Sequence, residues 1–295
     1  MFALDPTVRL ACRGVSDNTE QARFWNEEGG AAWVALQDRM DRQLEPLGLV
    51  GLKVADAKAG EHVLDVGCGC GGTTLLLAAA VGTRGSVRGV DISAPMAAVA
   101  NERAAKAGYA HMQVEVLDAQ TAELPSGEYD LVFSRFGVMF FADSGAAFAN
   151  IRSSVKPGGR LTFVCWQKPS LNDCLSISAR ALVEVLPPQP PVDPLAPGPF
   201  AFADPDRVTN ILTDAGWTGV AVQPHEQLLQ VGGVTDFDAT VELTMRIGPA
   251  SRALANFPDL REPARRAIAD AFRPHFQPEK GVMLGSAVWV VTARN

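Results

Sequence analysis

Residues 63–72, with the sequence VLDVGCGCGG, carry the densest chemical signal in the chain. An apolar run leads into four glycines within six residues, and an alanine-rich stretch follows. Glycine lets a backbone turn at positive φ and approach a ligand closely, and a helix start offers free N–H groups. The segment therefore predicts a strand, a ligand-binding turn and a helix that hold a nucleotide-like cofactor.

Two cofactors compete for this turn. Gly67, Gly69 and Gly72 satisfy the dinucleotide fingerprint G-x-G-x-x-G, and Asp91 follows at about the expected 20 residues. Asp65, two residues before the first glycine, argues against a dinucleotide, because its carboxylate would repel a pyrophosphate. S-adenosylmethionine carries an ammonium and a sulfonium and no phosphate, so the pattern D-x-G-x-G-x-G favours it. An NAD-dependent oxidoreductase stays open as the alternative.

The elements that must position this turn follow an α/β pattern. Short apolar runs alternate with alanine-rich segments between residues 61 and 166, which is typical of a parallel sheet with crossover helices. Ligands of such sheets bind outside the carboxyl ends of the strands. We expect strands at 62–66, 86–91, 113–117, 129–134 and 159–166, and helices at 73–81, 94–107 and 144–155.

The flanking segments are mostly helical or irregular. The chain to about residue 52 has apolar residues at helical spacing, and Pro46 and Gly48 are expected to end that helix. Eight prolines between residues 187 and 205 predict an irregular stretch, which we interpret as a wall over the site in preference to a linker. Asp204 is expected to cap a helix that reaches Ala215. Two late strands are expected at 219–231 and 287–292, with helices at about 235–247 and 262–272 between them.

The strand ends, taken together, resemble class I S-adenosylmethionine-dependent methyltransferases, and the branch with quinone-biosynthesis and small-molecule enzymes in particular. Residues 63–72 resemble the first motif of the family, and four further motifs follow in family order. These are GVDISAPM at 89–96, LDA at 117–119, SRFGVM at 134–139 and VKPGGRL at 155–161. The resemblance implies an α/β fold with a Rossmann-like, doubly wound, seven-stranded sheet whose last strand is antiparallel.

The resemblance also implies a role for each residue around the cofactor. Asp91 would hold the ribose hydroxyls, and Ile92 and Met96 would flank the adenine. Asp118 would accept from the adenine amino group, and Ala119 would offer its backbone N–H. The complete expected set is Asp65, Gly67, Cys68, Gly69, Gly71, Asp91, Ile92, Met96, Asp118, Ala119 and Ser134.

Aromatic residues mark the expected acceptor side. Residues 24–33, with the sequence FWNEEGGAAW, resemble the helical lid of such enzymes, and we expect Trp25 and Trp33 to contact the substrate. Phe136, after the fourth strand, and Phe200, in the proline-rich stretch, are expected to line an apolar pocket. In the alternative interpretation, both tryptophans are core residues of the helix, and Phe200 only anchors the proline-rich stretch.

His225 and Arg135 are the expected catalytic residues. His225 lies on the predicted sixth strand, which can reach the acceptor side. Arg135 ends the fourth strand, where it would bind an acidic acceptor or, as the alternative, pair with a surface carboxylate.

We divide the chain into an N-terminal helical lid at 1–55 and a methyltransferase domain at 56–295, with substrate-side insertions at about 170–203 and 232–285. The expected activity is methyl transfer from S-adenosylmethionine to a small, apolar or aromatic acceptor by O-, C- or N-methylation, leaving S-adenosylhomocysteine. Two alternatives stay open: a methyltransferase that acts on a macromolecule, and a cofactor-binding protein without catalysis.

Composition narrows the class of protein and its partners. The 295 residues are 47% hydrophobic and 20% charged, which excludes disordered and fibrous proteins. A net charge of -7 argues against nucleic-acid binding, and no apolar stretch approaches the roughly 20 residues of a membrane span. The spacing of Cys68 and Cys70, C-x-C, predicts no metal site. We expect a cytoplasmic protein with a small-molecule acceptor, and we leave a homodimer open.

Overall fold

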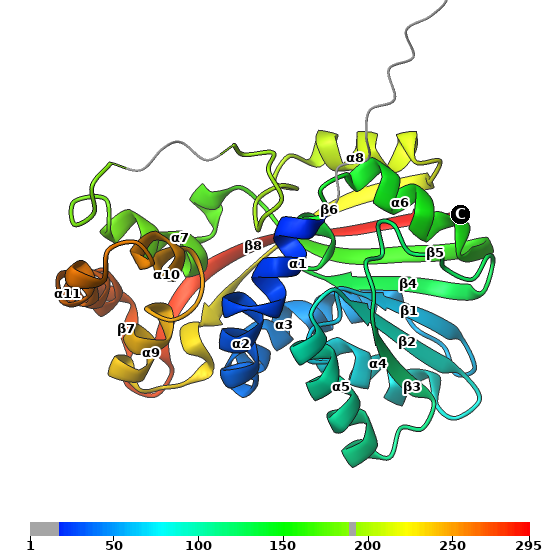
Figure 1. Ribbon diagram of the computed structural model, residues 1–295, viewed down its shortest axis with the longest axis horizontal. Helices are drawn as coiled ribbons and strands as arrows, with labels where there is room; N and C mark the ends of the chain where they lie inside the picture. The colour runs from blue at the N-terminus through cyan, green and yellow to red at the C-terminus, as the bar shows by residue number, and fades with distance from the viewer. Residues whose placement is uncertain (1–17, 189–192) are drawn as a thin grey trace, which may run out of the picture.

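The computed structural model describes residues 18–188 and 193–295, which form a doubly wound α/β fold with a helical cap at one end (Figure 1). Seven strands run in the order β3-β2-β1-β4-β5-β8-β6, and β7 pairs with β8. The first five strands pair in parallel, and β8 is antiparallel to both of its neighbours. This topology confirms the expected fold class. The strands are β1 His62–Val66, β2 Ser86–Asp91, β3 Met112–Val116, β4 Tyr129–Arg135, β5 Val155–Trp166, β6 Thr218–Gln230, β7 Phe276–Gln277 and β8 Gly281–Arg294.

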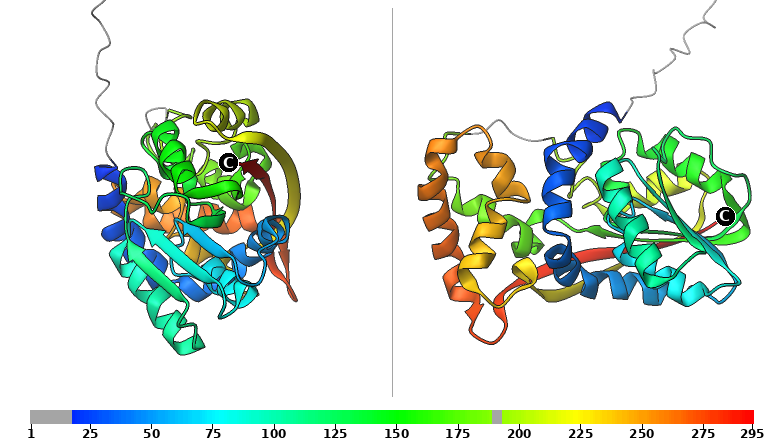
Figure 2. Two further views of the ribbon diagram at one scale, coloured as in Figure 1. Left: turned by 90° about the vertical axis from the view of Figure 1, so that its right-hand side faces the viewer. Right: turned by 60° about the horizontal axis from the view of Figure 1, so that its bottom comes forward.

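Helices cover both faces of the sheet (Figures 1 and 2). On the face of α3, α4 and α5, the buried side chains of Val63, Leu77 and Phe133 form part of one core. On the face of α6 and α8, the ring of Phe148 lies 5.6 Å from that of Phe163. The helices are α1 Thr19–Asn26, α2 Glu28–Ala35, α3 Gln37–Ala55, α4 Gly72–Val81, α5 Ala94–Ala107, α6 Ser144–Ser153, α7 Asp173–Ala181, α8 Pro205–Asp214, α9 Phe237–Thr244, α10 Pro249–Leu254 and α11 Arg261–Phe272, with the short 3-10 turn η1 Val138–Phe140.

Helix starts lie where the sequence places capping residues. Asp204 accepts a hydrogen bond from the N–H of Asp206, at 3.0 Å, and so caps α8 as expected. Asp143 caps α6 in the same way, and Gly71, in the left-handed conformation, precedes α4. These caps fix the helix starts at the carboxyl edge of the sheet.

The expectation that Pro46 and Gly48 end the first helix was wrong. Helix α3 continues past both to residue 55. Pro46 has no N–H to donate to the carbonyl of Arg42. Pro46 and Arg42 are both exposed, so water can solvate that carbonyl. The chain instead breaks at Glu27 and Leu36, which separate α1, α2 and α3.

The last strand is much longer than expected. It begins at Gly281, six residues before the predicted start at Ala287, and it pairs with β5 only from Val288 onward. Before that residue it pairs with β6 as a two-stranded ribbon that leaves the sheet and carries the cap. The other expected helices and strands have bounds within four residues of the observed ones. The cap consists of α7, α9, α10 and α11 around the ribbon (Figure 1).

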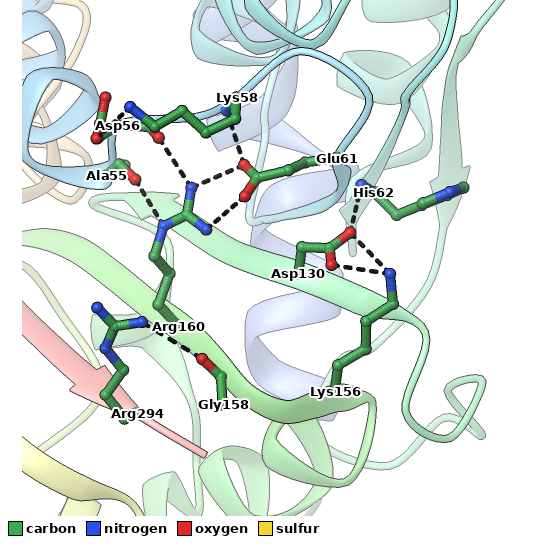
Figure 3. Close-up of polar contacts among 10 residues, drawn as sticks. All are labelled: Ala55, Asp56, Lys58, Glu61, His62, Asp130, Lys156, Gly158, Arg160 and Arg294. Atoms are coloured by element: carbon green, nitrogen blue, oxygen red, sulfur yellow. Dashed lines mark hydrogen bonds and ion pairs between the residues drawn. The ribbon is translucent and has the colours of Figure 1, made fainter.

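Ion pairs join neighbouring strands at the edge of the sheet opposite to the glycine turn (Figure 3). Arg160 donates to both carboxylate oxygens of Glu61, each at 2.7 Å. Lys156 donates to both oxygens of Asp130, which also accepts from the N–H of His62. These contacts join the starts of β1, β4 and β5, so the strand ends that carry the site lie at the other edge.

Candidate active site

The glycine turn after β1 packs directly against the loop after β4. Gly67 has a φ of 65°, and a Cβ there would lie 2.6 Å from the Cα of Gly137. A Cβ at Gly137 would in turn lie 2.7 Å from the carbonyl oxygen of Val66. Neither position accepts a side chain without displacement of backbone. The ends of β1 and β4 therefore touch backbone to backbone beneath the site.

Asp91, at the end of β2, is a buried carboxylate held by two backbone N–H groups. Its Oδ2 accepts from Gly69 at 2.7 Å, and its Oδ1 accepts from Ser93 at 2.8 Å. Desolvation raises the pKa of Asp91, although these donors oppose the effect. Each carboxylate oxygen can accept a second hydrogen bond, so Asp91 can also serve the hydroxyls of a ribose.

Asp65 differs from Asp91, because one of its oxygens has no partner among the residues that the structure describes. Its Oδ2 accepts from the hydroxyls of Thr73 and Thr74, at 3.0 and 2.7 Å. Its Oδ1 is buried and accepts no hydrogen bond from any residue in the described ranges. Desolvation raises the pKa of Asp65 to about 6. A buried, half-satisfied carboxylate favours a cationic ligand at this turn and disfavours a pyrophosphate.

Helix α1 is tied to the start of α5 by side chains that the sequence reasoning did not single out. Asn26 accepts from the N–H of Ala94 and donates to the carbonyl of Ile92, both at 2.9 Å. The hydroxyl of Ser93 donates to the carbonyl of Trp25 at 2.6 Å. The expected lid therefore lies across the end of β2, and a polar residue beside Trp25 was the available signal.

Asn18, the first residue described, ties the same lid to the next strand ends. It donates to Oδ1 of Asp118 at 2.8 Å and accepts from the N–H of Ala142 at 2.8 Å. Asp118 also accepts from the backbone N–H of Gln120. The carboxylate expected to read adenine is thus already positioned by both the lid and its own loop.

The remaining expected cofactor residues lie at this same edge and are largely buried. The hydroxyl of Ser134 accepts from the N–H of Gly137 at 3.3 Å, and the carbonyl of Ala119 accepts from Asn150. A Cβ at Gly69 would lie 2.9 Å from the methyl group of Met96. Burial raises the pKa of the Cys68 thiol, and no group of three metal-ligating side chains occurs in residues 18–188 and 193–295.

Arg135 points between α3 and α4, into an ion-pair cluster. Its guanidinium lies 3.8 Å from Oδ1 of Asp41, and the other oxygen of Asp41 lies 2.9 Å from Arg103. The side chain is only 11% exposed. Desolvation lowers the pKa of Arg135, and the charges of Asp41 and Asp65 oppose it. The arginine thus has a carboxylate partner within the protein, and that partner, Asp41, is half-buried and not a surface residue.

His225 lies on β6, which is an edge strand because β8 inserts between it and β5. It pairs with Val288, whose other neighbour is Trp166 at the end of β5. Two strand spacings, about 10 Å, therefore separate the histidine from β5. Its imidazole lies 3.0 Å from the side-chain oxygen of Gln227. The structure does not bring His225 to the glycine turn.

The expected acceptor-side aromatics fall into two groups. Trp25 lies edge to face against Trp33, Phe24 and Phe140, with ring centroids 6.0, 5.0 and 5.4 Å away. These four side chains are half-buried and form the aromatic cluster of the lid and η1. The cluster joins the N-terminal helices to the loop after β4.

Phe136 belongs to the second group. It stacks on Trp166 with centroids 4.2 Å apart and planes 5° apart, and its φ is 62°. A positive φ is strained for an aromatic residue, which marks the end of β4 as a candidate functional position. Phe200 is half-buried against the main core, and its neighbour Phe202 is fully buried between β5 and α6.

Comparison with known proteins identifies which part of the chain matches a known family and which proteins it resembles. Residues 63–159 match the family model described as a methyltransferase domain. The chain is 34% identical over 118 residues to aklanonic acid methyltransferase DauC of Streptomyces sp. (strain C5), covering 40% of this chain and 54% of the relative. It is 30% identical over 186 residues to nocamycin O-methyltransferase of Saccharothrix syringae, covering 60% and 66%.

The fold also matches solved structures. Haemonchus contortus phosphoethanolamine N-methyltransferase 2, solved with S-adenosyl-L-methionine, superposes with a TM-score of 0.56 at 19% identity, over 96% of this chain and 60% of that one. The chain spans a little over half to two thirds of the curated relatives named above. The likeness to the solved structure shows the fold.

Proposed function

We propose that this chain, whose residues 63–159 form a class I methyltransferase domain, transfers the methyl group of S-adenosylmethionine to a small organic acceptor with an apolar or aromatic body. One observation carries the proposal: Asp91 and Asp65 are buried at adjacent strand ends around the glycine turn, and one oxygen of Asp65 has no partner within residues 18–188 and 193–295. This charge suits a cationic cofactor. It does not suit NAD, whose pyrophosphate would approach the same turn.

The residues of the chain bind, orient and desolvate, since the sulfonium of the bound cofactor supplies both the methyl group and the leaving group. Asp91 accepts from the ribose hydroxyls, and Asp118 accepts from the adenine amino group. Asp65 balances positive charge beside the glycine turn. The lid, held by Asn18 and Asn26, excludes water from the reacting atoms.

A small acceptor is supported by the similar proteins, which include an aklanonic acid methyltransferase and a nocamycin O-methyltransferase. The aromatic cluster and the Phe136–Trp166 stack give an apolar surface to such a body. Roles of His225 and Arg135 in proton transfer or acceptor binding stay predictions, as do a cytoplasmic location and a homodimer. No helix within the described residues is long and apolar enough to cross a bilayer.

Calorimetric titration tests the cofactor assignment. Wild-type protein is titrated with S-adenosylmethionine, S-adenosylhomocysteine and NADH, and the series is repeated on Asp91→Ala. We expect both adenosyl ligands to bind and the variant to bind them about a hundred-fold more weakly, because two charged hydrogen bonds are lost. Asp130→Ala, a carboxylate removed from the opposite edge, is the matched control and should leave both affinities unchanged. NADH binding without adenosyl binding would overturn the proposal.

A further inference from the structure

Arg252, on α10 of the cap, is a cation that pairs with no carboxylate of the described residues. Its Cζ lies 4.3 Å from the centroid of the Phe24 ring, on the lid helix α1. Its guanidinium makes no ion pair or hydrogen bond with a residue in ranges 18–188 and 193–295. By contrast, Arg265 of the same cap pairs with Glu242 at 2.8 Å. The cap thus presents to the lid an arginine whose five N–H donors bind no group in the described part of the chain.

The side chain of Arg252 is exposed to solvent, although the residues around it partly desolvate the guanidinium. This partial desolvation lowers the pKa of Arg252. The contact with Phe24 supplies a cation–π attraction, which compensates only in part for lost water. Exposure to solvent on one side leaves the guanidinium open to a bound molecule.

This arginine stands at the junction of cap and lid, beside the aromatic cluster. Phe24 contacts Trp25, which contacts Trp33 and Phe140 in turn. Figure 2 shows α1 and α2 standing between the cap helices and the strand ends. A path of direct contacts therefore leads from Arg252 to the carbonyl of Trp25, which accepts from Ser93 at the cofactor site.

Unused polar groups lie on the same lid. The indole N–H groups of Trp217 and Trp289 donate to carbonyls, each at 3.0 Å. Those of Trp25 and Trp33 donate to no residue that the structure describes, and both side chains are half-buried, so these N–H groups face water or a bound molecule. The side-chain oxygen of Gln21, one turn before Phe24 on α1, is buried and also has no described partner. Polar groups left over beside apolar rings are typical of a site built for a ligand.

We infer that Arg252 binds a carboxylate of the methyl acceptor, while the aromatic cluster of Phe24, Trp25, Trp33 and Phe140 contacts the acceptor's aromatic body. The inference rests on the proposed function and extends it to a substrate class, the aromatic carboxylic acids. A guanidinium presents paired N–H donors that match the two oxygens of a carboxylate, and such charge-assisted bonds are strong when partly desolvated.

The test uses acceptor-like probes in matched pairs, with and without the carboxylate. The pairs are salicylate with phenol, 1-hydroxy-2-naphthoate with 1-naphthol, and 1-hydroxyanthraquinone-2-carboxylate with 1-hydroxyanthraquinone. Each is titrated calorimetrically into full-length protein, alone and saturated with S-adenosylhomocysteine, which prevents turnover. In at least one pair we expect wild type to prefer the acid about ten-fold, and Arg252→Ala to lose that preference.

Control variants separate recognition from structure. Arg246→Ala removes another cap arginine that is exposed and whose side chain forms no ion pair or hydrogen bond with the described residues, so it should keep the preference. Arg252→Lys should keep part of it, because the charge remains and the paired donors are lost. Arg252→Glu should favour the neutral member of each pair. Unchanged thermal unfolding midpoints of Arg252→Ala and of the three control variants exclude loss of fold.

Three results would overturn the inference. Wild type would show no preference for the acid in any pair, or Arg252→Ala would keep the preference. Alternatively, Arg252→Ala would weaken the binding of S-adenosylhomocysteine itself, which would make the cofactor's own carboxylate the partner of Arg252. The titration with S-adenosylhomocysteine distinguishes failure of the proposed function from failure of this inference. If the protein does not bind S-adenosylhomocysteine but keeps an Arg252-dependent preference for acids, methyl transfer is refuted and acid recognition stands.

Discussion

Asp65 and Asp91 are two buried carboxylates on neighbouring strands that are satisfied to different degrees. Both oxygens of Asp91 accept backbone N–H groups, whereas one oxygen of Asp65 accepts nothing from the described residues. An unsatisfied buried charge destabilises the free protein, and a ligand that brings positive charge removes that cost. At the scale of single residues, the site therefore trades stability for cofactor affinity.

The first prediction concerns Asp65→Asn and pH. The pKa of Asp65 is about 6 in the folded protein against an ordinary 3.8, so the folded state keeps the proton to higher pH than the unfolded chain. Its ionisation therefore lowers the free energy of unfolding as pH rises from about 4 to about 6, by up to about 3 kcal/mol. We expect Asp65→Asn to lose this decrease and to be more stable than wild type at pH 7, as measured by urea unfolding from pH 4 to 8.

Asp130→Asn is the matched control for this pH effect. Burial opposes ionisation at Asp130, but hydrogen bonds from His62 and Lys156 prevail and lower its pKa. Asp130 therefore stabilises the folded state above the unfolded pKa, and this stability is lost as pH falls. Its replacement should destabilise the protein at pH 7. Parallel pH profiles for wild type and Asp65→Asn would contradict the assigned cause.

The second prediction concerns the contact between Gly67 and Gly137. In Gly137→Ala the new methyl group would lie 2.7 Å from the carbonyl oxygen of Val66 and 2.8 Å from the Cα of Gly67. Because both neighbours are backbone atoms, we expect a loss of about 2–3 kcal/mol in the free energy of unfolding and weaker cofactor binding. Gly285→Ala, whose methyl group would meet no atom within 4 Å, should change neither. Urea unfolding and calorimetry check both variants.

At the scale of elements, the lid is held to the sheet by a few side-chain hydrogen bonds. Asn26 ties α1 to the start of α5, and Asn18 ties it to the end of β3 and the loop after β4. Short helices such as α1 and α2 are only marginally stable alone, so these contacts decide whether the lid stays closed. We expect opening of the lid to be the local event that admits the cofactor.

The third prediction is that Asn26→Ala loosens the lid. The substitution removes the acceptor for Ala94 and the donor to Ile92. At about 1 kcal/mol for each bond, the amides of residues 22–26 should exchange with solvent about thirty-fold faster. Glu27→Ala, at the next residue, removes an exposed side chain that forms no hydrogen bond or ion pair with the described residues, and it should leave exchange unchanged. Equal exchange in both variants, measured by mass spectrometry, would show that Asn26 does not hold the lid.

At the scale of the whole molecule, the cap and the sheet share strands. Both β6 and β8 begin or end in the sheet and continue into the ribbon that carries the cap. Asn172 fixes the point where the ribbon leaves, since it accepts from the N–H and donates to the carbonyl of Ala287. Continuous strands of this kind couple the two parts mechanically and thermodynamically.

The fourth prediction is that cap and sheet unfold together. Hydrogen exchange in increasing urea should give one midpoint for cap peptides at 237–272 and sheet peptides at 86–107. S-adenosylhomocysteine at a hundred times its Kd should raise the free energy of unfolding by about 2.7 kcal/mol for both. The Asp91→Ala variant should show the shared midpoint without the shift. Separate midpoints would mean that the cap folds on its own.

Local signals in the sequence predicted the cofactor half well. Glycines, caps such as Asp204 and apolar strands act over a few residues, so β1 to β5 and α5 lie within four residues of their expected positions. The failures depend on long-range contacts. Whether Pro46 breaks a helix depends on the solvent around Arg42, and the length of β8 depends on its pairing with β6. Likewise, Asn18 and Arg252 gain a role only from partners far along the chain.

The ribbon of β6 and β8 has a consequence for how such a protein can change over generations. The segment between the two strands, residues 231–280, begins and ends at neighbouring positions of a single ladder. Its replacement by another segment would leave the pairing of the sheet, and with it the glycine turn, untouched. The matched family region ends at residue 159, well before this insertion. Inheritance of the cofactor and adaptation to a new acceptor can therefore proceed as separate evolutionary events within one continuous sheet.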